Sequence, residues 1–284
     1  MKYIFFGTPD FAATILDKLI QANMKPDLVV TNPDKPAGRK QTMTAPPVKN
    51  TAARLGIPLI QPEDLDASLF DAEYDFFVVA AYGKLISKEV LDVSRLGSVN
   101  VHPSLLPKHR GPTPIQSAIL DGGDKTGVSL MLMDEKMDHG PILKISNFQF
   151  LISNETYTSL SDKLAELGAD MLIETLPKFM EGKITPKEQK HKNATLTKKF
   201  SSADAEIPCN DLRAALDGDK EKAEQIDRMI RALNPEPGTW TQTDDSSLLN
   251  LPKNKRVKIL KSEVRDGKLV LKKIQVEGKQ IREV

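Results

Sequence analysis

The 284-residue chain has one cysteine, Cys209, and only four histidines. A single cysteine excludes an internal disulfide and fits a reducing compartment, so we expect a cytoplasmic protein. Structural zinc sites need cysteines and histidines at short spacings, and because that pattern is absent we expect no metal. No apolar run approaches the ~20 residues of a membrane span, and the chain begins with a strand-like segment, so no membrane partner or targeting sequence is expected.

An excess of charge of one sign is also missing, since the formal net charge is +1. The charges are nevertheless unevenly placed: residues 178–199 hold seven lysines against two glutamates, and residues 251–284 hold eleven Lys/Arg against four Asp/Glu. Basic segments of this kind suit a phosphate backbone, although a solvated basic face explains the charge equally well. The length allows two domains with a substantial core.

The N-terminal residues predict a parallel sheet. An apolar strand at residues 2–6 is followed by a helix with Thr8 as its expected N-cap, and then by a second strand at residues 27–31. Strand, helix and strand in this order predict a Rossmann-like α/β fold. No Gly-x-Gly-x-x-Gly follows the first strand, so a dinucleotide is disfavoured.

Residues 98–143 contain most of the polar groups suited to chemistry. A short strand over residues 97–102 places Asn100 and His102 on the same face, because side chains alternate along a strand. Prolines end this strand and stiffen a loop that contains Leu105 and Leu106, which suggests the wall of a pocket. Asp138 lies in a turn-rich loop that precedes another strand, predicted over residues 142–150.

Two further segments predict binding functions. The small residues Ala81 and Gly83, on either side of Tyr82, follow a central strand over residues 74–80, and ligands of open parallel sheets bind at such strand ends. The connection over residues 32–48 is long, rich in proline and basic, and connections of this length are usually functional or disordered. A solvated loop is the alternative for that connection.

These patterns resemble the folate-dependent formyltransferases. The resemblance rests on Asn-x-His-x-Ser-Leu-Leu-Pro from Asn100, Arg-Gly-x-x-Pro-Ile from Arg110, and Asp-x-Gly from Asp138. It rests also on Phe-Gly-Thr-Pro-Asp-Phe-Ala from Phe6 and Pro-Asp-Lys-Pro-Ala-Gly-Arg from Pro33, which favour the members that act on charged tRNA. The similarity is strong to about residue 182 and weaker after about residue 206.

The resemblance implies formyl transfer from 10-formyltetrahydrofolate to the α-amino group of initiator methionyl-tRNA, without a metal. We expect Asn100 and His102 to donate hydrogen bonds to the oxyanion, with Asp138 favouring the charged form of His102 and relaying a proton. The implied folate-binding residues are Ser104, Leu105, Leu106, Pro107, Ala81, Tyr82 and Gly83. The implied tRNA-binding residues are Lys35, Arg39 and Lys40.

The expected architecture is an α/β, Rossmann-like formyltransferase domain over residues 1–182 and a basic linker over residues 183–205. A small, shortened β-barrel of the OB-like kind, expected to bind tRNA, follows over residues 206–284. Residues 203–233 are expected to be helical, and a hairpin is expected at Asp266-Gly267. A monomer is expected.

Three other functions stay open from the sequence. Two use the same chemistry: formylation of an amino sugar nucleotide, and hydrolysis of 10-formyltetrahydrofolate. The third is a non-enzymatic RNA-binding protein, which the joint presence of Asn100, His102 and Asp138 disfavours. The proline-rich connection over residues 32–48 disfavours the first two.

Overall fold

The computed structural model describes residues 1–38, 41–70, 73–146, 150–244 and 253–284. The chain divides into two compact units. Unit 1 comprises residues 1–114, 126–150 and 161–197, and unit 2 comprises residues 115–125, 151–160 and 198–284. The domain boundaries expected from the sequence stay a prediction.

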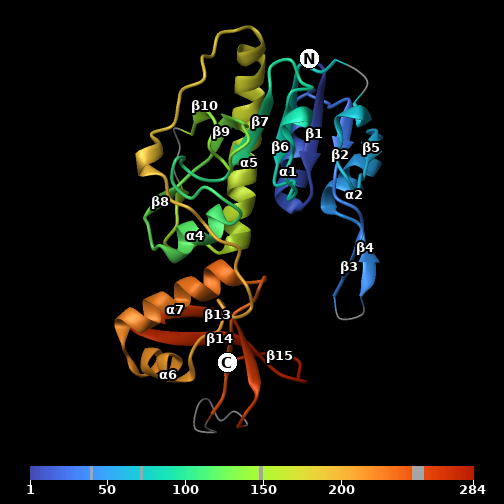
Figure 1. Ribbon diagram of the computed structural model, residues 1–284. Helices are drawn as coiled ribbons and strands as arrows, with labels where there is room; N and C mark the ends of the chain where they lie inside the picture. The colour runs from blue at the N-terminus through green and yellow to red at the C-terminus, as the bar shows by residue number, and fades with distance from the viewer. Residues whose placement is uncertain (39–40, 71–72, 147–149, 245–252) are drawn as a thin grey trace. The chain divides into compact units, whose positions relative to one another are not determined.

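The element bounds show strands and helices in alternation through the first half of the chain (Figure 1). The strands are β1 (Tyr3–Gly7), β2 (Leu28–Val30), β3 (Lys35–Ala37), β4 (Thr42–Thr44), β5 (Leu59–Ile60), β6 (Phe76–Ala80), β7 (Ser98–His102), β8 (Lys125–Thr126), β9 (Ser129–Leu132), β10 (Ile142–Ile145), β11 (Phe150–Leu151), β12 (Trp240–Gln242), β13 (Arg256–Arg265), β14 (Lys268–Val276) and β15 (Ile281–Glu283). The helices are α1 (Asp10–Gln21), α2 (Pro47–Arg54), α3 (Lys88–Leu91), α4 (Pro114–Leu120), α5 (Tyr157–Met180), α6 (Cys209–Asp217) and α7 (Lys220–Leu233), with short 3-10 turns at Ala67–Leu69 and His191–Asn193.

A seven-stranded sheet in the order β10-β9-β7-β6-β1-β2-β5 forms the centre of unit 1. The five strands from β7 to β5 run parallel, and β9 and β10 add an antiparallel edge. All residues of β1 and β6 are buried, as expected for strands covered on both faces. The predicted Rossmann-like α/β fold is therefore confirmed.

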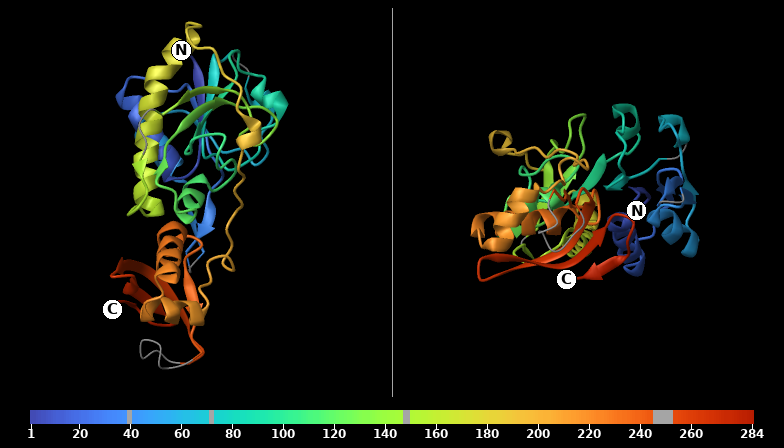
Figure 2. Two further views of the ribbon diagram at one scale, coloured as in Figure 1. Left: turned by 90° about the vertical axis from the view of Figure 1, so that its left-hand side faces the viewer. Right: turned by 90° about the horizontal axis from the view of Figure 1, so that it is seen from below.

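Helices α1 and α5 lie side by side on one face of the sheet, where Figures 1 and 2 both show them. Lys18 of α1 pairs with Asp170 of α5, with 3.3 Å between Nζ and Oδ1. Gly168 lets α5 approach β7 closely, because a Cβ there would lie 2.7 Å from a methyl carbon of Val101. Small residues in α5 thus bring this helix against the strand that delivers Asn100 and His102.

Three local expectations differ from the structure. Thr8 does not cap α1, which begins at Asp10 with Pro9 at the N-cap, because the Thr8 hydroxyl donates instead to the Tyr82 carbonyl at 2.9 Å. The connection over residues 32–48 contains an antiparallel hairpin, β3 with β4, instead of a simple loop. The strand expected over residues 142–150 is confirmed for Ile142–Ile145, while residues 147–149 lie outside the described part of the chain.

Unit 2 contains the sheet β12-β13-β14-β15, which is antiparallel throughout, with α6 and α7 packed against it. The expected small β domain thus takes the form of a four-stranded sheet. The helical region is shorter than residues 203–233, because it consists of α6 and α7. The predicted hairpin turn is confirmed, since Asp266 and Gly267 have φ values of 51° and 76° between β13 and β14.

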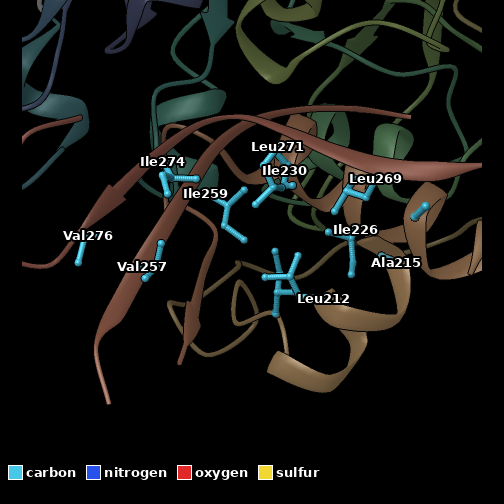
Figure 3. Packing of buried hydrophobic residues seen from close by; sticks show 12 residues of the cluster. Leu212, Ala215, Ile226, Ile230, Val257, Ile259, Leu269, Leu271, Ile274 and Val276 are labelled. Atoms are coloured by element: carbon cyan, nitrogen blue, oxygen red, sulfur yellow. The ribbon is translucent and has the colours of Figure 1, made fainter. Parts of the chain in front are cut away.

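An apolar cluster stabilises unit 2 (Figure 3). Leu212 comes from α6, Ile226 and Ile230 from α7, and Ile259 and Leu271 from the facing strands, and all are nearly inaccessible to solvent. The apolar residues of α7, such as Ala223, Ile226 and Ile230, are spaced three and four positions apart, so they lie on one face of the helix and that face is buried.

The segment over residues 187–197, expected to be part of a linker, packs on unit 1. The amide of Ile142 donates to the carbonyl of Lys187 at 2.8 Å, and the reverse bond has the same length. Further along, Arg110 donates from its backbone to Thr195 at 2.9 Å and accepts from Thr197 at 2.7 Å. We call residues 187–197 the strap.

Replacing Ile259 by alanine should destabilise unit 2 by about 2–5 kcal/mol. The variant loses the transfer free energy of the buried methyl and methylene groups, and a cavity remains in their place. Ile281, which is 51% exposed on the edge strand, is the matched control, and its change to alanine should cost less than about 0.5 kcal/mol. Urea unfolding followed by the fluorescence of Trp240, the only tryptophan, measures both. Equal losses for the two variants would contradict this packing.

Candidate active site

Strand β7 ends the parallel part of the sheet and delivers Asn100 and His102 to one face. The two residues are separated by one position, and the strand alternation puts their side chains on the same side. His102 is 4% exposed, and Asn100 is half-buried. Both lie at the carboxyl end of β7, which is where parallel sheets bind ligands.

Asp138 brings a carboxylate to this strand end from the loop between β9 and β10. Its Oδ2 accepts the backbone N–H of Gly111 at 2.7 Å, and its Oδ1 accepts the side-chain N–H of Asn100 at 3.2 Å. The same Oδ1 lies 3.5 Å from Nδ1 of His102, which is an ion-pair distance longer than a hydrogen bond. The structure thus brings together the three predicted catalytic side chains, whose roles stay a prediction.

His102 is oriented by a backbone carbonyl. Its Nε2 lies 2.9 Å from the oxygen of His109, and a carbonyl can only accept, so Nε2 carries the hydrogen. The ring therefore faces Asp138 with Nδ1 and a loop carbonyl with Nε2. His109 has a positive φ of 58°, which places its carbonyl in this position.

The loop over residues 104–107 is fixed by the hydroxyl of its own Ser104 and by that of Ser129 in β9. Ser104 is fully buried and donates from Oγ to Lys108 at 2.7 Å, while Ser129 Oγ donates to the Ser104 carbonyl at 2.7 Å. Leu106 is 3% exposed, and its N–H donates to Ser129 Oγ at 3.0 Å. Leu105 and Pro107 are half-buried and are the members of the loop whose side chains a ligand can contact.

Residues 81–83 lie at the end of β6, next to β7 in the sheet. Ala81 and Gly83 are exposed and have positive φ values of 46° and 83°. The Tyr82 side chain is 2% exposed inside an aromatic cluster, and burial raises the pKa of its hydroxyl. A ligand at this strand end can therefore reach Ala81 and Gly83, while Tyr82 is buried.

The β3–β4 hairpin is fixed at its base. Both carboxylate oxygens of Asp34 lie 2.8 Å from Lys49 Nζ, and Gln61 Nε2 donates to Oδ1 at 2.9 Å. These bonds, first from Lys49 and then from Gln61, hold the pKa of the Asp34 carboxyl below its ordinary value. Lys35 is exposed on β3, whereas Arg39 and Lys40 lie outside the described residues.

Two buried residues at the site, Arg110 and Gln189, were given no role from the sequence. Arg110, 6% exposed, donates from Nε and Nη2 to Gln189 Oε1 at 3.2 and 2.7 Å, and its Nη2 lies 2.9 Å from His191 Nδ1. Gln189 in turn donates to the carbonyls of Asp138 and Gly140 at 3.0 and 2.8 Å. Arg110 was visible in the Arg-Gly motif, but Gln189 lies in a segment whose composition predicts a linker.

Within the described ranges, no group of three or more His, Cys, Asp or Glu side chains is arranged to hold a metal ion. No helix in that same part of the chain has the length and apolarity to cross a membrane.

Comparison with known proteins decides the family. Residues 1–176 match the family model "Formyl transferase", and residues 216–272 match "Formyl transferase, C-terminal domain". The methionyl-tRNA formyltransferase of Halorhodospira halophila is 43% identical over 251 residues, which are 86% of this chain and 77% of the relative.

The chain belongs to the formyl transferase family. The predicted resemblance to the formyltransferases is confirmed.

Two solved structures share the fold of this formyl transferase at low identity. The methionyl-tRNA formyltransferase of Clostridium thermocellum aligns over 100% of both chains at 18% identity, with a TM-score of 0.60. An N-formyltransferase of Helicobacter canadensis, solved with folinic acid and dTDP-3-aminofucose, aligns over 93% of this chain and 88% of its own, at 18% identity and a TM-score of 0.63.

Replacing Gly140 by alanine should distort the loop that carries Asp138, because a Cβ at this position would lie 2.1 Å from the backbone oxygen of Leu132. The backbone of Leu132 would have to move to make room, which costs free energy, so we expect the free energy of unfolding to fall by about 1–3 kcal/mol. Gly123 is the matched control, since a Cβ there meets nothing within 4 Å. Thermal unfolding of the two variants checks this, and a Gly140→Ala protein as stable as Gly123→Ala would show that the loop is not constrained.

Proposed function

We propose that this formyl transferase moves the formyl group of 10-formyltetrahydrofolate to the α-amino group of methionine on initiator tRNA. The observation that carries the proposal is the cluster of Asn100, His102 and Asp138 at the carboxyl end of β7, where the loop after β7 holds His102 through the His109 carbonyl and Asp138 through the Gly111 N–H. The 43% identity to a methionyl-tRNA formyltransferase supports this choice of acceptor.

The amine that attacks must be neutral. An α-amino group has a pKa of about 7.7–8.0, so an appreciable minority is neutral near pH 7 without a strong base. The N–C bond forms at the formyl carbon, the bond from that carbon to folate N10 breaks, and one proton passes from the amine to N10.

The oxyanion formed during this attack is the harder problem, and Asn100 is the donor best placed for it. A carboxamide nitrogen carries two hydrogens, and Asp138 takes one of them at 3.2 Å. The second hydrogen can donate to the formyl oxygen. A donor of this kind is worth about 2.7–4 kcal/mol in the transition state.

His102 and Asp138 complete the polar environment. Because Nε2 of His102 already donates to the His109 carbonyl, a direct bond from His102 to the oxyanion requires the substrate to displace that carbonyl. We therefore assign the first oxyanion contact to Asn100 and the second to His102 in the substrate complex. Asp138 orients both and relays the proton toward N10 through water.

The folate is proposed to lie across the adjacent ends of β6 and β7. The exposed Ala81 and Gly83 would take the pterin, and the half-buried Leu105 and Pro107 would contact it from the other loop, while the buried Tyr82 would support the strand end. Ser104 and Leu106 would hold that loop in shape, because both are buried.

The β3–β4 hairpin is proposed to contact the tRNA. Its base is fixed by Asp34, Lys49 and Gln61, so cations on the hairpin can reach a nucleic acid without rearrangement of the sheet. Lys35, Arg39 and Lys40 supply those cations. The basic strands of residues 206–284 are proposed as a second tRNA contact, and the monomeric state also remains a proposal.

The decisive experiment offers the purified protein 10-formyltetrahydrofolate with charged initiator tRNA, with an amino sugar nucleotide, or with no acceptor. We expect formylation of the tRNA alone. Formylation of the sugar nucleotide would overturn the acceptor, rapid loss of formyl without an acceptor would indicate a hydrolase, and tRNA binding without turnover would indicate a non-enzymatic protein.

Replacing Asn100 by alanine should lower kcat/KM by roughly 10²–10³ with little change in folate affinity, because the lost donor acts on the transition state. The exposed Asn50 in α2 is the control, and Asn50→Ala should keep the rate. Steady-state kinetics with varied folate measure both parameters. An unchanged rate in Asn100→Ala would remove Asn100 from the oxyanion role.

Replacing Arg39 by alanine should weaken formylation of the tRNA by about 1–3 kcal/mol, because a guanidinium offers a planar fork to a phosphate or a guanine edge. Lys40→Ala should cost less, since an ammonium is a point charge. Slow folate hydrolysis without tRNA should keep its wild-type rate in both variants. If Arg39→Ala lowers both rates alike, the hairpin supports the active site and the tRNA assignment is wrong.

A further inference from the structure

Gln189 lies in the strap, far in sequence from the catalytic candidates, yet it contacts the loop that carries one of them. Its side chain is 5% exposed and makes four hydrogen bonds. Two run to the carbonyls of Asp138 and Gly140, and two come from the guanidinium of Arg110.

The chemistry of these partners fixes which way the amide points. Carbonyl oxygens can only accept, so Nε2 faces Asp138 and Gly140 at 3.0 and 2.8 Å. A guanidinium can only donate, so Oε1 faces Arg110. A carboxamide supplies two donors and an acceptor together, whereas a carboxylate lacks the donors and an apolar side chain lacks both.

The loop held in this way is strained at the catalytic carboxylate. Asp138 has a φ of 49°, in the left-handed region that costs free energy for a residue with a Cβ. This backbone geometry directs the carboxylate to Gly111 N–H at 2.7 Å and to Asn100 at 3.2 Å. The buried Nε2 of Gln189 donates to the carbonyls of Asp138 and Gly140, the residues before and after His139. These two hydrogen bonds oppose relaxation of the loop.

The strap itself is well placed to hold Gln189. Backbone pairs join it to Ile142 on one side of Gln189 and to Arg110 on the other. The Arg110 side chain bonds to Gln189, and the Arg110 backbone bonds to Thr195 and Thr197. Arg110 therefore fixes the strap through both its side chain and its backbone.

We infer that Gln189 is a positioning residue, which holds the peptide of Asp138 so that its carboxylate meets Gly111 and Asn100. The inference rests on the proposed function for its kinetic consequences. It assigns to the strap a part in catalysis in addition to the connection of two units.

Gln189→Glu tests this role, because it keeps the size and the acceptors for Arg110 but removes both donors and sets a carboxylate against two carbonyls. A displacement near 1 Å at a reacting group costs up to about 100-fold, so kcat should fall by about 10–100-fold with both KM values within about threefold. Glu188→Gln, the reverse exchange at an adjacent side chain that is 77% exposed, should keep wild-type kinetics.

A second readout does not depend on catalysis. In protein labelled with ¹⁵N-glycine, loss of the charged bond to Asp138 should move the Gly111 amide proton upfield and speed its exchange with solvent. Gln189→Met, which keeps the apolar packing, should produce the same change and serves if the glutamate variant does not fold.

The outcomes separate the two proposals. A fall in kcat together with a changed Gly111 amide supports the positioning role. A wild-type kcat, or a Gly111 amide that does not move in either variant, overturns it. If the wild-type protein formylates no tRNA, the proposed function fails, and the Gly111 amide still decides whether Gln189 holds Asp138.

Discussion

The hydrogen bond from the Gly111 amide to the Asp138 carboxylate joins the parts of this protein on which the proposed chemistry depends. It connects the loop after β9 to the loop after β7, and the same carboxylate also takes the Asn100 side chain. Hydrogen bonds to a charged group are stronger than neutral ones, and they gain from a partly buried site. This bond therefore sets the distance between the strand end and the carboxylate.

The surrounding network follows from the cost of burying polar groups. A buried guanidinium such as that of Arg110 must find acceptors, and the strap provides them through Gln189 and His191. His139 stacks on His191 with ring centroids 4.2 Å apart, and its Nδ1 lies 2.7 Å from Asp134. His139 and Asp134 both belong to the loop of Asp138, so this loop contacts the strap through the stacked rings as well as through Gln189.

The sequence predicted the parts that depend on short-range periodicity. Alternation along one strand placed Asn100 beside His102, and strand and helix in sequence predicted the parallel sheet. Asp138 could be linked to this pair only through the resemblance to a family, since 36 positions separate it from His102. The Asp-Gly turn between β13 and β14 was predictable because those residues tolerate positive φ.

The remainder depended on partners that are distant in the sequence. The Thr8 hydroxyl donates to the carbonyl of Tyr82, 74 positions away, and does not cap α1. Rules for helix caps consider neighbouring residues only, so they could not predict this partner. The strap has a lysine-rich composition typical of a linker, although its backbone pairs with Ile142 of β10 and with Arg110 in the loop after β7. Gln189 was hidden for the same reason, because its role comes from carbonyls 51 and 49 positions earlier.

The central claim is that Asn100 faces the formyl oxygen, and a crystal structure with a non-reactive folate analogue that carries a formyl group on N10 tests it most directly. The account predicts the formyl oxygen about 2.7–3.1 Å from Asn100 Nδ2, with the pterin against Ala81 and Gly83. A formyl oxygen beyond hydrogen-bond reach of Asn100, or a folate bound away from the ends of β6 and β7, would contradict it.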